Sequence, residues 1–284
     1  MRKYVALLLV ALPLSACGGS QQISLADAAT KSTSVPSMKM DMTTAMSTPQ
    51  LPQPVILTAT GAAENANHRV RMNIDMSSLV GSLGAPSGVK AADFKGEEIG
   101  DLANGHLILY MKLPFLTKLI PGRKPWIKFD LNSYGRSLGI DLSQFTSLSA
   151  NPAQMIDWIR ATSGSIEKVG SETIDGVPTT QYHATIDLSK YPQLVPANRR
   201  AAMKRAVDAL IKTAHVRTFP MDAWVGDDKL VRKLRLKFAE TVRGQKIALD
   251  VSMQFHDFGA PVNISLPPAN QTVDLAKIAP PGKP

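Results

Sequence analysis

Hydrophobic and polar residues alternate with a period of two along much of the chain, which is typical of half-buried β-strands. The clearest example is segment 35–43, where Met38, Met40 and Met42 share one face. Segment 68–77 repeats the pattern with Met72, Ile74 and Met76. Further strands are expected at 55–60, 107–113, 126–131, 163–173, 177–188, 219–225, 229–240 and 246–255. Tight turns between consecutive strands, such as Asp175-Gly176, predict a mainly antiparallel sheet.

Helical spacing occurs in three other segments. Ser24 can cap a short helix to about residue 32, and Asn151 can cap another to about residue 161. The longest helix is expected at 196–214, with one apolar stripe and an otherwise basic surface. Segment 80–92 is rich in Gly, Ser, Ala and Pro and is predicted to be a loop. The pattern as a whole predicts an α+β fold in a single domain.

The first residues have the order of a secretion signal. Two cations, an apolar run too short to span a bilayer and a few small residues precede Cys17, the only cysteine. A thiol in that place would accept acyl chains such as palmitate, as in a lipobox. The sequence therefore predicts a signal peptide at 1–16, a lipidated flexible tether at 17–23 and a folded domain at 24–284. The alternative is an ordinary signal peptide with an incidental cysteine.

Charge and cysteine content add two constraints. The formal net charge is +9, and removal of Arg2 and Lys3 with the signal leaves +7. A basic protein outside the cytoplasm could contact anionic lipid headgroups, or the charge could serve solubility alone. We expect no nucleic-acid partner. A single cysteine excludes an intramolecular disulfide, so packing must hold the domain together.

Enzymatic motifs are not evident in the sequence. The five histidines lack metal-ligand spacing, and neither a G-x-S-x-G elbow nor a phosphate-binding glycine loop occurs. We therefore expect no enzyme, no metal and no cofactor. The methionines at 38, 40, 42 and 46 leave two interpretations open. They could line a core or a surface for variable apolar ligands, or they could bind Cu(I).

Several motifs of the second half resemble a known family. They are segments 170–183, 222–230 and 255–262, followed by Leu266-Pro267-Pro268. Together with the lipobox, they are similar to the actinobacterial LppX/LprA/LprF/LprG lipoproteins, which have a LolA/LolB-like fold. The resemblance implies a highly curved antiparallel sheet, a half-barrel, with helices packed on its concave face. Between sheet and helices it implies an apolar cavity for acyl chains, and it supplies no catalytic residues.

The expected function is that of an envelope lipoprotein, anchored to the cell membrane through Cys17, that binds acyl chains of lipids or lipoglycans. It would carry them across the envelope, with an unidentified envelope transporter as a further partner and segment 80–92 as a gate. The alternative is a non-transport sensor or scaffold on the same fold. The residues expected to line the cavity are Met38, Met40, Met42, Met72, Ile74, Met76, Leu107, Leu109, Met111, Met203, Val207, Leu210 and Ile211. Those expected to contact headgroups or the membrane are Arg199, Arg200, Lys204 and Arg205, whose alternative role is a solvated helix face.

Overall fold

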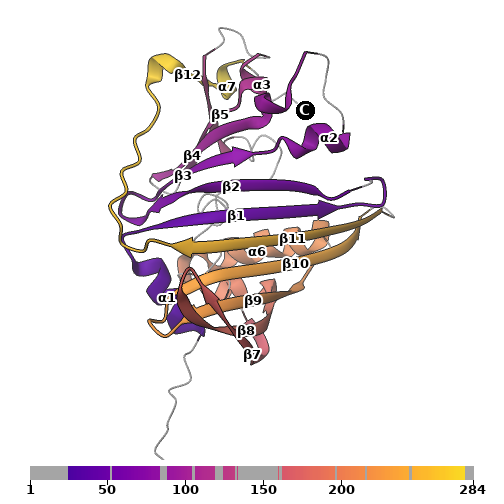
Figure 1. Ribbon diagram of the computed structural model, residues 1–284, viewed down its shortest axis with the longest axis vertical. Helices are drawn as coiled ribbons and strands as arrows, with labels where there is room; N and C mark the ends of the chain where they lie inside the picture. The colour runs from indigo at the N-terminus through magenta and orange to yellow at the C-terminus, as the bar shows by residue number, and fades with distance from the viewer. Residues whose placement is uncertain are drawn as a thin grey trace, which may run out of the picture.

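A single curled sheet dominates the computed structural model of the protein (Figure 1). The structure describes residues 25–51, 53–83, 88–103, 106–118, 124–131, 133, 159, 162–195, 197–214, 216–242 and 245–278. Within them, twelve strands follow one another in the order β12-β6-β5-β4-β3-β2-β1-β11-β10-β9-β8-β7. The expected signal peptide, Cys17 and the tether lie outside the described residues. So does the helix expected near 151–161, apart from Ile159.

Two antiparallel meanders make up this sheet. The first is formed by β1 (Ser37–Ser47), β2 (Val55–Glu64), β3 (Arg69–Asp75), β4 (Lys95–Ala103), β5 (His106–Lys112) and β6 (Trp126–Asp130). The second is formed by β7 (Thr162–Ile174), β8 (Val177–Asp187), β9 (Thr218–Gly226), β10 (Val231–Val242) and β11 (Gln245–His256). They join where β1 pairs with β11, for example Met40 with Phe255. The short β12 (Thr272–Asp274) adds to β6 in parallel, so β12 and β7 are the two edges.

The main hydrophobic core covers one face of the sheet, which we call the inner face. Alternate residues point to it, as the period of two requires. Across the register, Gly61, Met40 and Phe255 occupy one row, and Leu236 pairs with Val251 in another. Fully buried members of this core include Met38, Met40, Ala63, Ile186, Met221, Leu234, Met253 and Phe255. The predicted alternation in the first strands is therefore confirmed.

Small residues allow the sheet to curl toward its inner face. A Cβ atom at Gly61 would lie 2.0 Å from the carbonyl oxygen of Arg71 and 2.6 Å from Sδ of Met72. A Cβ atom at Gly96 would lie 2.3 Å from the carbonyl oxygen of Lys112. Both glycines face the core side of the register, and no side chain fits where neighbouring strands come this close. The glycines of β2 and β4 therefore permit the close strand approach that the curvature of the sheet requires.

Helical segments pack on the inner face and at one end of the sheet. Leu25, Ala28 and Ala29 of α1 (Leu25–Ser34) enter the core, and Ser32 Oγ accepts a hydrogen bond of 2.8 Å from the Val231 amide. Residues Leu188 and Tyr191 of η5 (Leu188–Gln193) also pack on the core. The long α6 (Ala197–Ala214) packs along η5. The shorter helical segments are η1 (Asn65–Asn67), α2 (Ser78–Leu83), η2 (Ala91–Phe94), α3 (Pro114–Thr117), η6 (Ala269–Gln271) and α7 (Leu275–Ile278).

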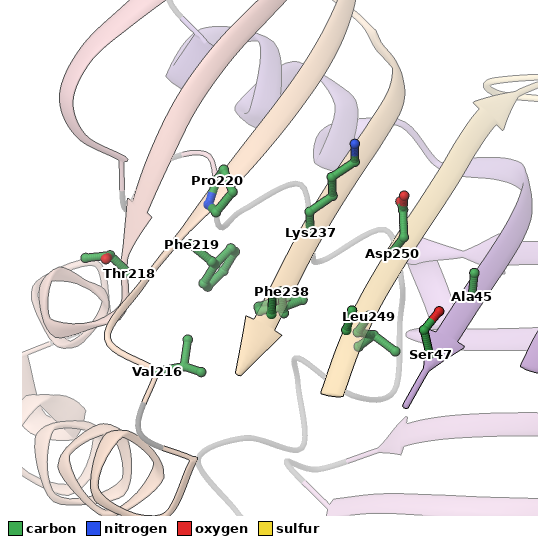
Figure 2. A pocket seen from close by; sticks show the side chains of 12 residues that line it. Ala45, Ser47, Val216, Thr218, Phe219, Pro220, Lys237, Phe238, Leu249 and Asp250 are labelled. Atoms are coloured by element: carbon green, nitrogen blue, oxygen red, sulfur yellow. The ribbon is translucent and has the colours of Figure 1, made fainter. Parts of the chain in front are cut away.

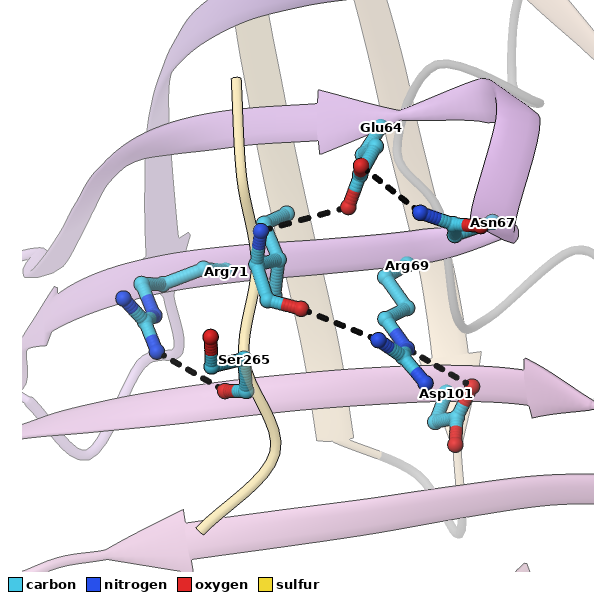
Figure 3. A network of polar contacts seen from close by, with 7 residues as sticks. Glu64, Asn67, Arg69, Arg71, Asp101 and Ser265 are labelled. Atoms are coloured by element: carbon cyan, nitrogen blue, oxygen red, sulfur yellow. Dashed lines mark hydrogen bonds and ion pairs between the residues drawn. The ribbon is translucent and has the colours of Figure 1, made fainter.

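The outer face is crossed by residues 259–268, which we call the C-terminal strap (Figures 1 and 3). Its Ile264 is buried against Ile99 and Trp126 in a second small core. The Ile264 amide donates to Oε2 of Glu64 at 3.2 Å, and its carbonyl accepts from Nη1 of Arg69 at 3.1 Å. The strap thereby leads the chain from β11 across to β12 at the far edge of the sheet.

Most predicted elements are confirmed, but two strands and the short helices α3 and α7 were not predicted, and one loop differs. β4 was not predicted, because its sequence Lys-Gly-Glu-Glu-Ile-Gly-Asp-Leu-Ala is poor in β-branched residues. β12 was not predicted either, since three residues carry little periodicity. The loop expected at 80–92 is wrong in part: α2 extends to Leu83 and η2 begins at Ala91, while 84–87 lie outside the described residues. The α+β class with a curved antiparallel sheet is confirmed.

Candidate functional site

A pocket of about 650 Å³ opens where β1, β9, β10 and β11 end side by side (Figure 2). Residues from both faces of the sheet line it, because consecutive residues such as Lys237 and Phe238 point to opposite faces. Its lining residues are Ala45, Ser47, Val216, Thr218, Phe219, Pro220, Lys237, Phe238, Ala239, Ala248, Leu249 and Asp250.

The inner wall of this pocket is apolar. It is made by Val216, Phe219, Phe238 and Leu249, which also pack against the main core. The rings of Phe219 and Phe238 lie 4.7 Å apart between centroids, and Phe238 pairs with Leu249 across β10 and β11. The wall is therefore an extension of the inner face that reaches the surface at the strand ends.

The rim of the pocket carries charge. Lys237 and Asp250 lie opposite each other on β10 and β11. The Arg235 guanidinium donates hydrogen bonds of 2.9 and 2.6 Å to the two oxygens of Asp250 and lowers the pKa of that carboxyl. Lys237 is exposed, and within the described residues it has no ion pair or hydrogen bond of its own. The strand ends therefore present an exposed cation on the outer face and an apolar wall on the inner face.

The thirteen predicted cavity residues lie on the inner face or on α6, and none of them lines this pocket. Five of them belong to the main core or pack against it: Met38, Met40, Met42, Met72 and Ile74. Leu107, Met203 and Val207 are buried, whereas Met76, Leu109, Met111 and Ile211 are partly exposed. The side chain of Leu210 lies outside the described residues. Their contact with a ligand stays a prediction.

The predicted basic surface lies on α6, which ends at Ala214, two positions before Val216 of the pocket wall. Arg200, Lys204 and Arg205 are exposed, and Lys204 forms an ion pair of 2.7 Å with Asp208. The side chain of Arg199 lies outside the described residues. Met203 and Val207 are buried on the opposite stripe, which confirms the amphipathic pattern of the helix.

Glu98 is a polar residue of the inner face that the sequence analysis missed. It pairs with Met72 on β3 and Met111 on β5, and burial raises the pKa of its carboxyl. The adjacent Glu97 points to the outer face, where Arg71 lies 3.1 Å away. Two consecutive glutamates within a strand must face opposite sides, so recognition of β4 as a strand would have revealed Glu98.

Other polar groups form pairs on the surface without the geometry of a reaction centre. His183 Nδ1 lies 2.8 Å from Asp222 Oδ1, and Lys233 lies 4.4 Å from the centre of the Trp224 ring. Among the described residues, no group of three or more His, Cys, Asp or Glu side chains could hold a metal ion. None of the helices in that part of the chain combines the length and apolarity needed to cross a bilayer.

These features define an α+β protein with one open, curled sheet and an apolar pocket at its strand ends. Among solved structures, the chain is similar to lipoprotein LppX of Mycobacterium tuberculosis, with a TM-score of 0.43 and 12% identity over 85% of this chain and 94% of that one. It is similar to LprF from Mycobacterium bovis, with a TM-score of 0.43 and 14% identity over 87% and 96%. For a putative outer membrane lipoprotein-sorting protein domain from Vibrio parahaemolyticus, the TM-score is 0.30 and the identity 8% over 85% and 93%.

The sequence comparisons give a shorter match. No family model matches the chain. A Streptomyces griseus protein, described as an uncharacterized 31.2 kDa protein in the rplA-rplJ intergenic region, is 31% identical over 166 residues. The match covers 55% of this chain and 50% of that protein, so the chain spans about half the length of the curated relative.

Proposed function

We propose that the protein binds an acyl chain of a lipid in the pocket at the ends of β1, β9, β10 and β11. The observation that carries this proposal is the apolar wall of Val216, Phe219, Phe238 and Leu249, which joins the inner face to the surface. Each methylene removed from water there contributes about 0.8 kcal/mol before the losses of ligand and side-chain freedom. Binding of this kind requires no catalyst.

The charge at the rim supports a lipid with an anionic headgroup. Lys237 precedes Phe238 of the apolar wall in β10, points to the opposite face beside Asp250 and has no ion pair among the described residues, so its ammonium group could receive a phosphate or carboxylate at the strand ends. The headgroup of such a lipid would remain in water near Lys237, while its acyl chain is buried against the apolar wall.

The envelope setting is part of the same proposal. The sequence before the described residues has a lipobox pattern, and acylation of Cys17 would hold the domain at a membrane surface outside the cytoplasm. In that setting the protein would take up a lipid from one membrane and carry it through the envelope.

The direct test is lipid co-purification with a variant that fills the pocket. Full chain carrying Cys17→Ser is purified from the envelope of a bacterial host and examined by native mass spectrometry and lipid extraction. We expect one lipid per protein, and loss of that lipid when Leu249→Trp is added. Val169→Trp is the matched control, because Val169 is 51% exposed on the edge strand β7 and does not line the pocket. It should retain the lipid.

The proposal fails if the protein keeps an apo mass after incubation with diacyl phospholipid, or if the two tryptophan variants retain the lipid equally. Thermal unfolding of both variants shows whether each is folded.

A further inference from the structure

The inner face of β4 differs from that of every neighbouring strand. Its alternate residues are Gly96, Glu98 and Gly100, so one carboxylate stands between two positions without side chains. The residues that flank Glu98 across the register are Met72 and Met111. A long acidic side chain on an otherwise apolar surface is costly unless its oxygens receive hydrogen bonds.

The carboxylates on the outer face of the same strand all have partners. Glu97 lies 3.1 Å from Arg71, and Asp101 lies 3.4 Å from Arg69. By contrast, Glu98 forms no hydrogen bond or ion pair within the residues that the structure describes, and burial raises the pKa of its carboxyl. These carboxylates belong to one strand, so whether each has a partner depends on the face to which its side chain points.

The neighbouring side chains cannot donate a hydrogen bond to the Glu98 carboxylate. A thioether has no proton to donate, so neither Met72 nor Met111 can supply a hydrogen bond. Met72 also leans toward β2, since its Sδ lies only 2.6 Å from the Cβ position at Gly61. The glycines at 96 and 100 have no side-chain donors. Glu98 is half-buried, so a donor for its carboxylate is either water or a group from outside these strands.

We infer that Glu98 is a recognition site for a hydrogen-bond donor, a hydroxyl or an ammonium group, carried by a long-chain lipid on the inner face. This inference rests on the proposed function and names the chemical class of its ligand. Four strand spacings separate β4 from β11, or about 19 Å along the sheet. A ligand that contacts both Glu98 and the pocket must therefore be extended, which suits a lipid rather than a compact metabolite.

The test compares three probes of equal chain length: hexadecylamine, hexadecanol and methyl palmitate. The first carries an ammonium group, the second a hydroxyl group and the third no donor. Their affinities are measured by displacement of a fluorescent acyl ester from the full chain carrying Cys17→Ser. The wild-type side chain at position 98 should favour the amine and the alcohol over the ester by about tenfold or more.

Two substitutions at position 98 separate the two donor classes. Glu98→Leu should remove the preference for both donor probes and leave the ester bound at least as tightly. Glu98→Gln keeps an acceptor oxygen, so it should retain the preference for the alcohol and lose the additional affinity for the amine. Glu97→Gln is the matched control, a neutralised carboxylate on the opposite face, and should leave the order of the three probes unchanged.

The outcomes distinguish this inference from the proposed function. If the ester binds and Glu98→Leu leaves the order of the probes unchanged, the role of Glu98 is refuted and acyl binding stands. If none of the three probes binds to the protein with Glu98 intact, acyl binding itself is refuted. Circular dichroism and thermal unfolding confirm that each variant is folded.

Discussion

At the scale of single residues, the environment of a side chain rather than its type decides its contribution. Glu97 and Glu98 are identical and adjacent, yet the first pairs with Arg71 and the second lies on the apolar face with a raised pKa. The folded state thus binds the Glu98 proton more tightly than the unfolded chain does, and ionisation of Glu98 opposes folding.

The pH dependence of this effect can be predicted. The cost of ionisation is absent below the pKa of an unfolded glutamate, about 4.3, and is complete above the raised pKa of the folded state. We expect Glu98→Gln to stabilise the protein by about 1 kcal/mol near neutral pH, and to have no such effect below about pH 4. Urea unfolding at the two pH values measures this. An equal increase in unfolding free energy at both pH values would contradict the conclusion that ionisation of Glu98 opposes folding. Glu97→Gln should not increase the unfolding free energy at either pH.

A second prediction concerns the curl of the sheet at Gly61. Alanine there would place a carbon 2.0 Å from the Arg71 carbonyl oxygen, which belongs to the backbone and cannot rotate away. We expect Gly61→Ala to cost about 3 kcal/mol of unfolding free energy. At Gly81 in α2, an added Cβ meets nothing within 4 Å, so Gly81→Ala should be neutral or slightly stabilising. Similar melting temperatures for the two variants would refute this account.

At the scale of elements, the C-terminal strap binds the outer face of the first meander. It combines one buried side chain, Ile264, with backbone hydrogen bonds to Glu64, Arg69 and Arg71. Its charged partners also belong to strand pairs, since Arg69 and Arg71 face carboxylates on β4. The strap therefore links β2, β3 and β4 and brings β12 to the edge at β6.

Removal of the strap's apolar anchor should destabilise the whole domain. Ile264 is 2% exposed, and Ile264→Ala is expected to cost about 2–4 kcal/mol because it leaves a cavity beside Ile99 and Trp126. Ile56→Ala, at a position that is 49% exposed, should change stability by less than about 0.5 kcal/mol. Denaturant unfolding of the two variants provides the comparison. Equal stabilities would show that the strap contributes little.

At the scale of the whole molecule, exposed cations lie on two elements of the second half of the chain, β10 and α6. The pocket lies where β9, β10 and β11 end, Val216 of its wall follows α6, and Lys237 stands at its rim. The exposed cations Arg200, Lys204 and Arg205 lie on α6, the helix that precedes Val216 in the chain. A pocket that faced a membrane from this side would meet anionic headgroups with opposite charge.

This orientation predicts a dependence of membrane binding on α6. Reversal of Arg200, Lys204 and Arg205 to Glu should weaken binding to vesicles that contain anionic lipid by tenfold or more, at about 1 kcal/mol for each cation near the surface. Vesicle co-sedimentation at low and high salt measures the effect. The control reverses the same number of exposed charges elsewhere, at Lys39, Lys90 and Lys168. If both triple variants bind alike, α6 is not the contact surface.

The sequence by itself determined the features that depend on local periodicity. Alternation identified the inner faces of β1 and β3. The turn Asp175-Gly176 was recognisable because Asp-Gly is favoured where both central residues need positive φ, and in the structure their φ angles are 50° and 77°. Helical spacing identified the buried stripe of α6. In each case, the signal lies within a few neighbouring residues.

Only the tertiary structure decided which of these segments meet. The pairing of β1 with β11 and the anchoring of the strap by Arg69 join residues about 200 positions apart, as in the hydrogen bond between Arg69 and Ile264 over 195 residues. The pocket is assembled from the ends of four strands, and the isolation of Glu98 follows from the neighbours that β3 and β5 place beside it. A local pattern fixes the face to which a side chain points, but burial and partners depend on packing between distant segments, which no local pattern contains.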